Sequence, residues 1–136
     1  MKNLLGEKIK ISEAEVLRDI MHYLQLRGVF FFRNNSGSYE NNGRWITFGK
    51  KGSSDLIAIF NGENKTGRGK GMSWFIEVKR PEGGKLSDDQ IKFLLEVRKH
   101  GGIATVATSV ADIEHVMMDM SHPMEARYEE ALRLSM

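Results

Sequence analysis

Cysteine is absent from the 136-residue chain, and this absence excludes disulfides, thiolate metal sites and cysteine nucleophiles. No apolar run approaches the roughly 18 residues that a membrane span requires. The segment from Met1 to Ser12 is polar and lacks the apolar stretch of about 7–15 residues that a secretory signal contains. We therefore expect a soluble, cytoplasmic protein without a membrane partner.

No charge of one sign dominates, because 20 Lys and Arg stand against 18 Asp and Glu. The net charge of +2 excludes a disordered polyelectrolyte and does not by itself indicate a nucleic-acid binder. The distribution along the chain is less even. Residues 44–85 contain nine basic and four acidic residues, and the rest contains eleven basic and fourteen acidic residues. This basic middle segment is compatible with an enzyme that acts on nucleic acid.

Hydrophobic periodicity and turn residues predict the order of the elements. One folded domain over 12–117 is expected between an arm, 1–11, and a helical tail, 118–136. The order is helix, three or four strands, helix, strand, helix, in its shorter form α-β-β-β-α-β-α. This order predicts an α/β fold in which helices flank a central mixed β-sheet. Helices are expected over 12–27, 87–100 and 109–117, strands over 29–32, 44–48, 55–60, 73–79 and 103–107, and a basic, glycine-rich loop over 61–72.

The residues with catalytic potential lie on two neighbouring predicted strands. Glu77 and Lys79 are two residues apart, so their side chains project from the same face of a strand. Asp55 starts the preceding apolar strand. If the two strands pair, two carboxylates and one ammonium group meet, which suits a hard divalent cation such as Mg²⁺. A Glu-x-Lys sequence alone is more often a solvated ion pair.

Five short motifs occur in one order along the chain. They are Arg33-Asn34-Asn35-Ser36-Gly37, Gly52-Ser53-Ser54-Asp55, Glu77-Val78-Lys79, Gly84-Lys85-Leu86-Ser87 with Gln90, and Gly101-Gly102. Together they resemble the VRR-NUC nucleases, a branch of the PD-(D/E)xK superfamily, over about residues 12–117. The resemblance implies a restriction-endonuclease-like core and a DNA endonuclease that depends on Mg²⁺ or Mn²⁺.

The resemblance also implies roles for individual residues. Asp55 and Glu77 would bind the metal, together with the backbone carbonyl of Val78. Lys79 would orient the attacking water or stabilise the transition state, and Gln90 would support the site. The chain departs from the superfamily at Ser54, where proline is usual; that position shapes the backbone and does not touch the metal.

The family brings one more glutamate to the metal, from the first helix. Glu13 shares a helical face with the apolar Val16 and Ile20, so it is expected to point inward. Glu15 lies on the polar face and has the spacing of a capping-box partner of Ser12. Glu13 is therefore the preferred ligand, with Glu15 as the second candidate.

Basic and polar residues near the site are expected to bind DNA phosphates. Tyr39 and Trp45 are weaker candidates for stacking on bases, and Phe30 to Phe32 are expected in the core. The candidate DNA-binding residues are Arg33, Asn35, Arg44, Lys50, Lys51, Lys65, Arg68, Lys70, Arg80 and Lys85.

The chain looks like the standalone VRR-NUC proteins of phages and bacteria. That likeness implies branched DNA substrates, including four-way (Holliday) junctions, a homodimer, and a location in a bacterial or phage-infected cell. No nucleotide cofactor is expected. A sequence-specific restriction-type endonuclease is disfavoured, because little chain lies outside the core to recognise a sequence. Two further hypotheses are a non-catalytic DNA-binding module with the same fold and an interaction protein with a structural Glu77–Lys79 pair.

Overall fold

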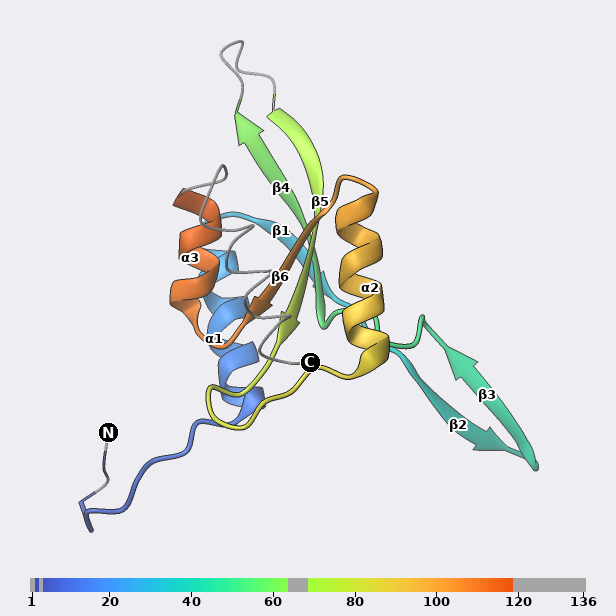
Figure 1. The fold of residues 1–136 in the computed structure, drawn as a ribbon, viewed down its shortest axis with the longest axis horizontal. Coiled ribbons are helices and arrows are strands. Elements are labelled where there is room, and N and C mark those ends of the chain that lie inside the picture. Colours follow the sequence, from blue (N-terminus) through green and yellow to red (C-terminus); the bar gives the residue numbers. More distant parts are fainter. Residues whose placement is uncertain (1, 3, 64–68, 119–136) are drawn as a thin grey trace.

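The computed structural model describes residue 2, residues 4–63 and residues 69–118. Its centre is a four-stranded mixed sheet with the strand order β1-β4-β5-β6. β1 and β4 are antiparallel, as are β4 and β5, whereas β5 and β6 are parallel. The predicted α/β fold with a mixed central sheet is confirmed (Figure 1). The strands are β1 (Phe30–Arg33), β4 (Leu56–Glu63), β5 (Gly69–Val78) and β6 (Ile103–Ala107).

Three helices within the described residues flank this sheet: α1 (Glu13–Leu26), α2 (Asp88–Lys99) and α3 (Val110–Met118). Ser12 caps α1 by accepting a hydrogen bond from the Glu15 backbone N–H. α2 begins with the complete capping box that its sequence predicts. Both helices begin directly after these serines, because each serine side chain accepts a hydrogen bond from a first-turn N–H that has no partner within the helix.

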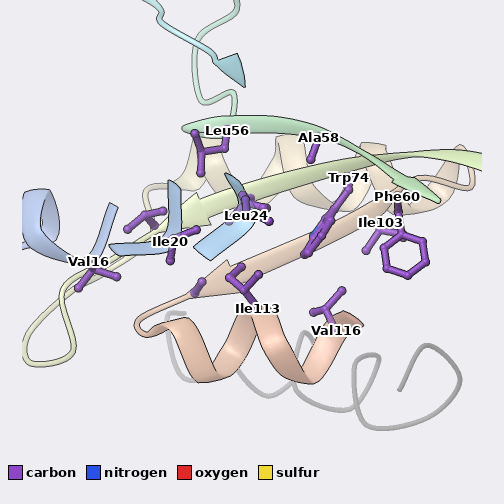
Figure 2. Close-up of a cluster of buried hydrophobic side chains, with 13 residues drawn as sticks. Val16, Ile20, Leu24, Leu56, Ala58, Phe60, Trp74, Ile103, Ile113 and Val116 are labelled. Carbon is purple, nitrogen blue, oxygen red and sulfur yellow. The ribbon is translucent and has the colours of Figure 1, made fainter. Parts of the chain in front are cut away.

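The main core lies between one face of the sheet and the helices α1 and α3 (Figure 2). Alternate residues of β4 and β5 point into it, as the twofold periodicity of a strand requires. Buried Trp74 donates a hydrogen bond from Nε1 to Thr105 Oγ1 at 2.9 Å, which satisfies its polar atom. α2 packs against the opposite face, where Phe93 meets Phe75 with ring centroids 5.2 Å apart. The helices therefore lie on both faces of the sheet, and β5 is covered on each side.

A two-stranded antiparallel sheet, β2 (Gly37–Asn41) and β3 (Arg44–Phe48), stands apart from the central sheet. We call residues 37–48 the ribbon; it projects from the body of the molecule beside the start of α2 (Figure 1). Asn42 and Gly43 connect its strands with φ angles of 52° and 78°, the left-handed conformation of a tight hairpin turn. The prediction missed β2, since Tyr39 alone gives almost no apolar alternation. Five strands therefore precede α2.

The predicted loop over 61–72 is also wrong in part. β4 continues to Glu63 and β5 begins at Gly69, with Asn61 opposite Gly71 and Gly62 opposite Lys70. Ladder hydrogen bonds between the two backbones form without any help from side chains, so glycine does not prevent them. Within the described part of the chain, no helix is long and apolar enough to cross a membrane.

The prediction that Phe30 to Phe32 lie in the core is correct only for Phe31, which packs against the core cluster. Phe30 is 69% exposed and Phe32 is 49% exposed. β1 is an edge strand, and its two outer phenylalanines face the side of the sheet on which α2 packs over β5 and β6. Phe30 and Phe32 are exposed because α2 covers β5 and β6 and not β1. The apolar sequence around these residues does not indicate which strands a helix will cover.

Candidate active site

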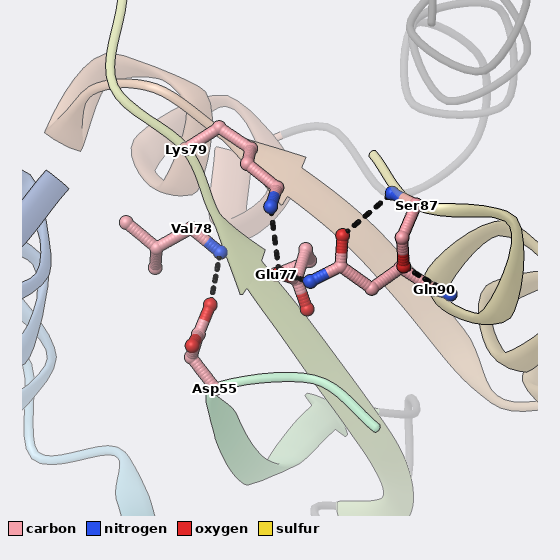
Figure 3. A network of polar contacts seen from close by, with 6 residues as sticks. All are labelled: Asp55, Glu77, Val78, Lys79, Ser87 and Gln90. Atoms are coloured by element: carbon pink, nitrogen blue, oxygen red, sulfur yellow. Dashed lines mark hydrogen bonds and ion pairs between the residues drawn. The ribbon is translucent and has the colours of Figure 1, made fainter. Parts of the chain in front are cut away.

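Antiparallel pairing places Asp55 beside the end of β5. Leu56, the next residue, lies opposite Ile76 in the ladder. The Val78 backbone N–H donates a hydrogen bond of 2.7 Å to Asp55 Oδ2 (Figure 3). The strand pairing on which the predicted site depends is therefore present, and it fixes Asp55 against the backbone of the Glu77-Val78-Lys79 segment.

Glu77 is a buried carboxylate at the centre of the site, with 1% of the residue exposed. Its Oε1 lies 3.6 Å from Lys79 Nζ and accepts a hydrogen bond of 2.8 Å from Gln90 Nε2. Its Oε2 is buried and has no hydrogen-bond partner among the described residues. A buried carboxylate oxygen without a partner is energetically costly, so this atom needs an explanation.

The acidity of Glu77 reflects this environment. Its pKa is raised from 4.5 to about 8, first by burial and then by the negative charge of Asp55. Lys79 opposes the shift, and the charge of Glu13 adds to it. The protein alone therefore favours a neutral Glu77, and a positive charge between the carboxylates would be needed to hold it ionised at neutral pH.

Gln90 connects the site to the start of α2. Its backbone N–H donates to Ser87 Oγ at 3.1 Å, and its Oε1 accepts from the Ser87 N–H at 2.9 Å. The other end of the same amide, Nε2, donates to Glu77 (Figure 3). The capping role and the site role expected for Gln90 therefore coexist, because different atoms make the two sets of contacts.

Sequence reasoning missed the contribution of Asn34. Its side chain Nδ2 lies 2.9 Å from Ser53 Oγ and 3.1 Å from Ser54 O, and donates to both. Its backbone N–H donates to Asp55 O at 2.8 Å. Asn34 therefore fixes the segment from Ser53 to Asp55, whose last residue is a candidate metal ligand. The available signal was its place in the Arg33 to Gly37 motif, which carries no information about partners.

Ser54, the residue that replaces the usual proline, is completely buried. Its Oγ has no hydrogen-bond partner among the described residues. Its backbone carbonyl, by contrast, accepts the bond from Asn34. The departure from the superfamily pattern thus adds no side-chain hydrogen bond to the carboxylates.

Glu13 is exposed, so the expectation that it points into the interior is wrong as far as burial is concerned. It lies in the first turn of α1, before the buried stripe that starts at Val16. It nevertheless lines a cavity of about 420 Å³ together with Lys79. Glu15 is also exposed and donates its backbone N–H to Ser12. Of the two glutamates, Glu13 is the one that borders this cavity.

Two cavities border the site and hold several of the candidate DNA-binding residues. Asn35 and Lys51 line a cavity of about 350 Å³ that also reaches Asp55 and Gln90. Arg80 and Lys85 line the cavity beside Glu13. These four residues therefore line the cavities that the candidate catalytic residues also line.

The remaining candidates lie elsewhere. Arg33 ends β1, Arg44 is on the ribbon and Lys50 follows β3, and all three are exposed. Lys70 is near the start of β5, seven residues before Glu77, or about 23 Å along the strand, so its expected place beside the site is wrong. Lys65 and Arg68 lie outside the described residues.

The donor set fits a small divalent cation. The described residues contain no cluster of three or more His, Cys, Asp or Glu side chains arranged to hold a metal. Mg²⁺, however, commonly uses only one or two protein carboxylates and retains several waters. Asp55 and Glu77 supply two such carboxylates. A cation would give the buried Glu77 Oε2 atom a partner and would offset the repulsion between the two negative charges.

Comparison with protein families identifies one family. The model of the VRR-NUC domain matches residues 14–111, and the match includes Asp55, Glu77, Lys79 and Gln90. The chain belongs to the VRR-NUC family. The VRR-NUC domain is a nuclease-type domain that acts on DNA. A comparison with curated proteins found no match.

Proposed function

We propose that this VRR-NUC protein is a metal-dependent DNA endonuclease with its active site at Asp55, Glu77 and Lys79. The observation that carries the proposal is the buried Glu77 carboxylate, with one oxygen unpaired beside the Asp55 carboxylate. A purely structural ion pair with Lys79 does not require a second acid nearby, and that acid raises the cost of ionising Glu77.

Asp55 and Glu77 are the residues that would hold Mg²⁺ or Mn²⁺, with the carbonyl of Val78 and with Glu13, or alternatively Glu15, from α1. When bound, such an ion polarises the scissile phosphate and lowers the pKa of a coordinated water. Lys79 offers an ammonium group, held 3.6 Å from Glu77, to orient that water or to stabilise developing negative charge. Gln90 fixes the carboxylate of Glu77 and leaves Oε2 available for the ion.

The substrate would be DNA held by its phosphates. Lys51 and Asn35 on one side of the site, and Arg80 and Lys85 on the other, border cavities that reach the catalytic residues. Arg80 and Lys85 add positive charge beside the two acids, which attracts a polyanion, whereas Lys51 lies 3.4 Å from Asp89 in an exposed ion pair. Phosphate contacts of this kind would position the DNA backbone at the carboxylates. This arrangement supports phosphodiester hydrolysis and does not by itself favour one DNA structure.

We further propose branched DNA, including four-way junctions, as the preferred substrate of a homodimer. The support is the resemblance of the sequence motifs to the VRR-NUC proteins of phages and bacteria. Two symmetric active sites suit two cuts on a symmetric junction. A restriction-type enzyme would instead cleave linear duplex at one recurring sequence.

The test compares cleavage of a synthetic four-way junction, a linear duplex of the same sequence and a supercoiled plasmid, with Mg²⁺, with Mn²⁺ and with a chelator. The variants are Asp55→Ala and Lys79→Ala, and the matched control is Lys92→Ala, an exposed lysine of α2. We expect metal-dependent cleavage by the wild type and the control, with a preference for the junction, and loss of cleavage in both site variants.

Each competing function has its own result. DNA binding without cleavage by the wild type under every metal condition would identify a non-catalytic module. Cleavage that survives Lys79→Ala would show that the active site lies elsewhere. Absence of both DNA binding and metal binding would favour an interaction protein. Sedimentation of the protein alone and with the junction tests the dimer.

A further inference from the structure

The ribbon carries three large aromatic side chains that are exposed to water. Trp45 is 72% exposed, Tyr39 50% and Phe48 46%. An isolated two-stranded hairpin is at best marginally stable in water, and every residue of β2 and β3 is exposed. Large aromatic side chains kept in water on such an element are typical of a binding surface.

Aromatic groups occupy both faces of the ribbon. Tyr39 lies opposite Ile46 in the ladder, and its ring centroid is 6.3 Å from that of Phe48 on the same face. Trp45 lies opposite Glu40 and therefore points to the other face. The Tyr39 and Phe48 rings support each other, whereas Trp45 is left available to contact a partner.

The base of the ribbon lies at the candidate active site. Asn35 and Ser36, which lead into β2, line the same cavity as Asp55. Gly49, which follows β3, approaches Asn35 so closely that a Cβ atom there would be 2.6 Å from the Asn35 carbonyl oxygen. The two ends of the ribbon therefore lie side by side at its base. A molecule that reaches Asp55 from this side therefore passes the ribbon.

The charge around the ribbon suits a polyanion. Residues 33–51 contain four basic residues, Arg33, Arg44, Lys50 and Lys51, and one acidic residue, Glu40. Arg44 immediately precedes Trp45, so its side chain leaves the strand on the other face, that of Tyr39 and Phe48. Exposed aromatic rings on an element with an excess of basic residues suit base stacking combined with phosphate contact. A second copy of the same chain would bring the same excess of positive charge, which disfavours it as the occupant.

We propose that the ribbon binds the DNA next to the cleavage site, with Trp45 stacked on an unpaired base. This inference rests on the proposed nuclease function. Trp45 is four residues from Gly49, or about 13 Å along a strand, which equals about four base steps of a DNA strand.

The two tryptophans of the chain allow a direct test, because Trp45 is exposed whereas Trp74 is completely buried. The experiment uses the Asp55→Asn protein to prevent cleavage, and measures acrylamide quenching of tryptophan fluorescence with and without a four-way junction. A Trp45→Phe version of the same protein reports Trp74 alone. We expect the junction to protect Trp45 from quenching and to leave the Trp74 signal unchanged.

Binding affinity gives an independent measurement. Trp45→Ala is expected to weaken junction binding by roughly five- to 150-fold, the range for loss of one base–aromatic stack, whereas Trp45→Phe is expected to retain most of the affinity. Phe30→Ala is the matched control, because Phe30 is also exposed but lies at the end of β1 away from Asn34. It is expected to bind like the parent protein.

Three results would overturn the inference. If the junction binds and is cleaved by the wild type while Trp45 stays fully quenchable, the ribbon does not contact DNA and the nuclease proposal stands. If the protein binds neither the junction nor the linear duplex, the nuclease proposal fails and this inference fails with it. If Trp45 becomes protected as protein concentration rises without DNA, the occupant is a second copy of the chain.

Discussion

Strands β4 and β5 of the central sheet are antiparallel, and so are the two strands of the ribbon, but the two pairs are stabilised differently. The centre of β5 is covered on both faces, and Trp74, Ile76 and Val78 are completely buried. The ribbon has no buried residue. The acids of the site extend from the covered sheet, and the candidate DNA-contacting aromatics extend from the ribbon. The candidate catalytic acids, which must be fixed to within tenths of an ångström, thus lie on the rigid central sheet. The proposed DNA-contacting surface, which must adapt to a flexible polymer, lies on the ribbon, which has few packing contacts.

The largest expected effect separates catalysis from structure within the central sheet. Lys79→Ala is expected to lower the rate of DNA cleavage by about 10²- to 10⁴-fold, the usual contribution of a group that assists proton transfer or charge stabilisation. Rates on the four-way junction under saturating metal are the measurement, with Lys92→Ala as the control. If the rate fell equally in the control, a general loss of positive charge would be the cause, and Lys79 would have no special role.

Two isoleucines compare the packing of the two elements. Ile76→Ala, in the covered centre of β5, is expected to destabilise the protein by about 2–5 kcal/mol. Ile46→Ala, on the ribbon and 36% exposed, is expected to change stability by less than about 1 kcal/mol. Urea unfolding with a common m-value measures both. Equal losses would mean that the ribbon packs against another part of the molecule.

The buried acid of the central sheet predicts a pH dependence. The pKa of Glu77 is about 8 in the folded protein and 4.5 in the ordinary case, so the folded state holds a proton that the unfolded state releases between these values. Without metal, the contribution of Glu77 to the free energy of unfolding is therefore fully present below about pH 4.5 and is lost as the pH rises to about 8. Glu77→Gln removes this loss.

Thermal unfolding across this pH range in a chelating buffer is the measurement. Glu40→Gln is the matched control, because Glu40 is an exposed acid of the ribbon, and it is expected to keep the wild-type profile. Mg²⁺ is expected to raise the melting temperature more at pH 8 than at pH 5, since only the ionised carboxylate binds it. An identical Mg²⁺ effect at both pH values would contradict Glu77 as a ligand.

The smallest effect separates the two roles of the α2 start. Gln90→Ala is expected to lower cleavage by about 10- to 100-fold, as for other residues that orient a metal ligand. Ser87→Ala removes the cap acceptor and leaves the contact between Gln90 and Glu77, so it is expected to lower stability by about 0.5–2 kcal/mol with little change in the cleavage rate. Similar rate losses in the two variants would mean that Gln90 acts only through the helix cap.

Several features could be predicted because they depend on neighbours in the chain. The apolar spacing of Val16 and Ile20 indicated a helix, and Ser87 with Gln90 indicated the start of another. The types of residue at Asp55 and Glu77 indicated the chemistry of the site. β2 could not be predicted in this way, since its strand conformation depends on pairing with β3 and not on its own alternation.

Local pattern was thus enough for the order of most elements, their caps and the kinds of groups that the site contains. Long-range packing decided the rest. The ladder register that sets Leu56 opposite Ile76 brings Asp55 to the Val78 backbone, and the docking of α2 brings Gln90 to Glu77. The exposure of Phe30 and the raised pKa of Glu77 likewise depend on what covers each side chain. Burial and strand register depend on contacts between segments that are far apart in the sequence, so the local sequence around a residue does not determine them.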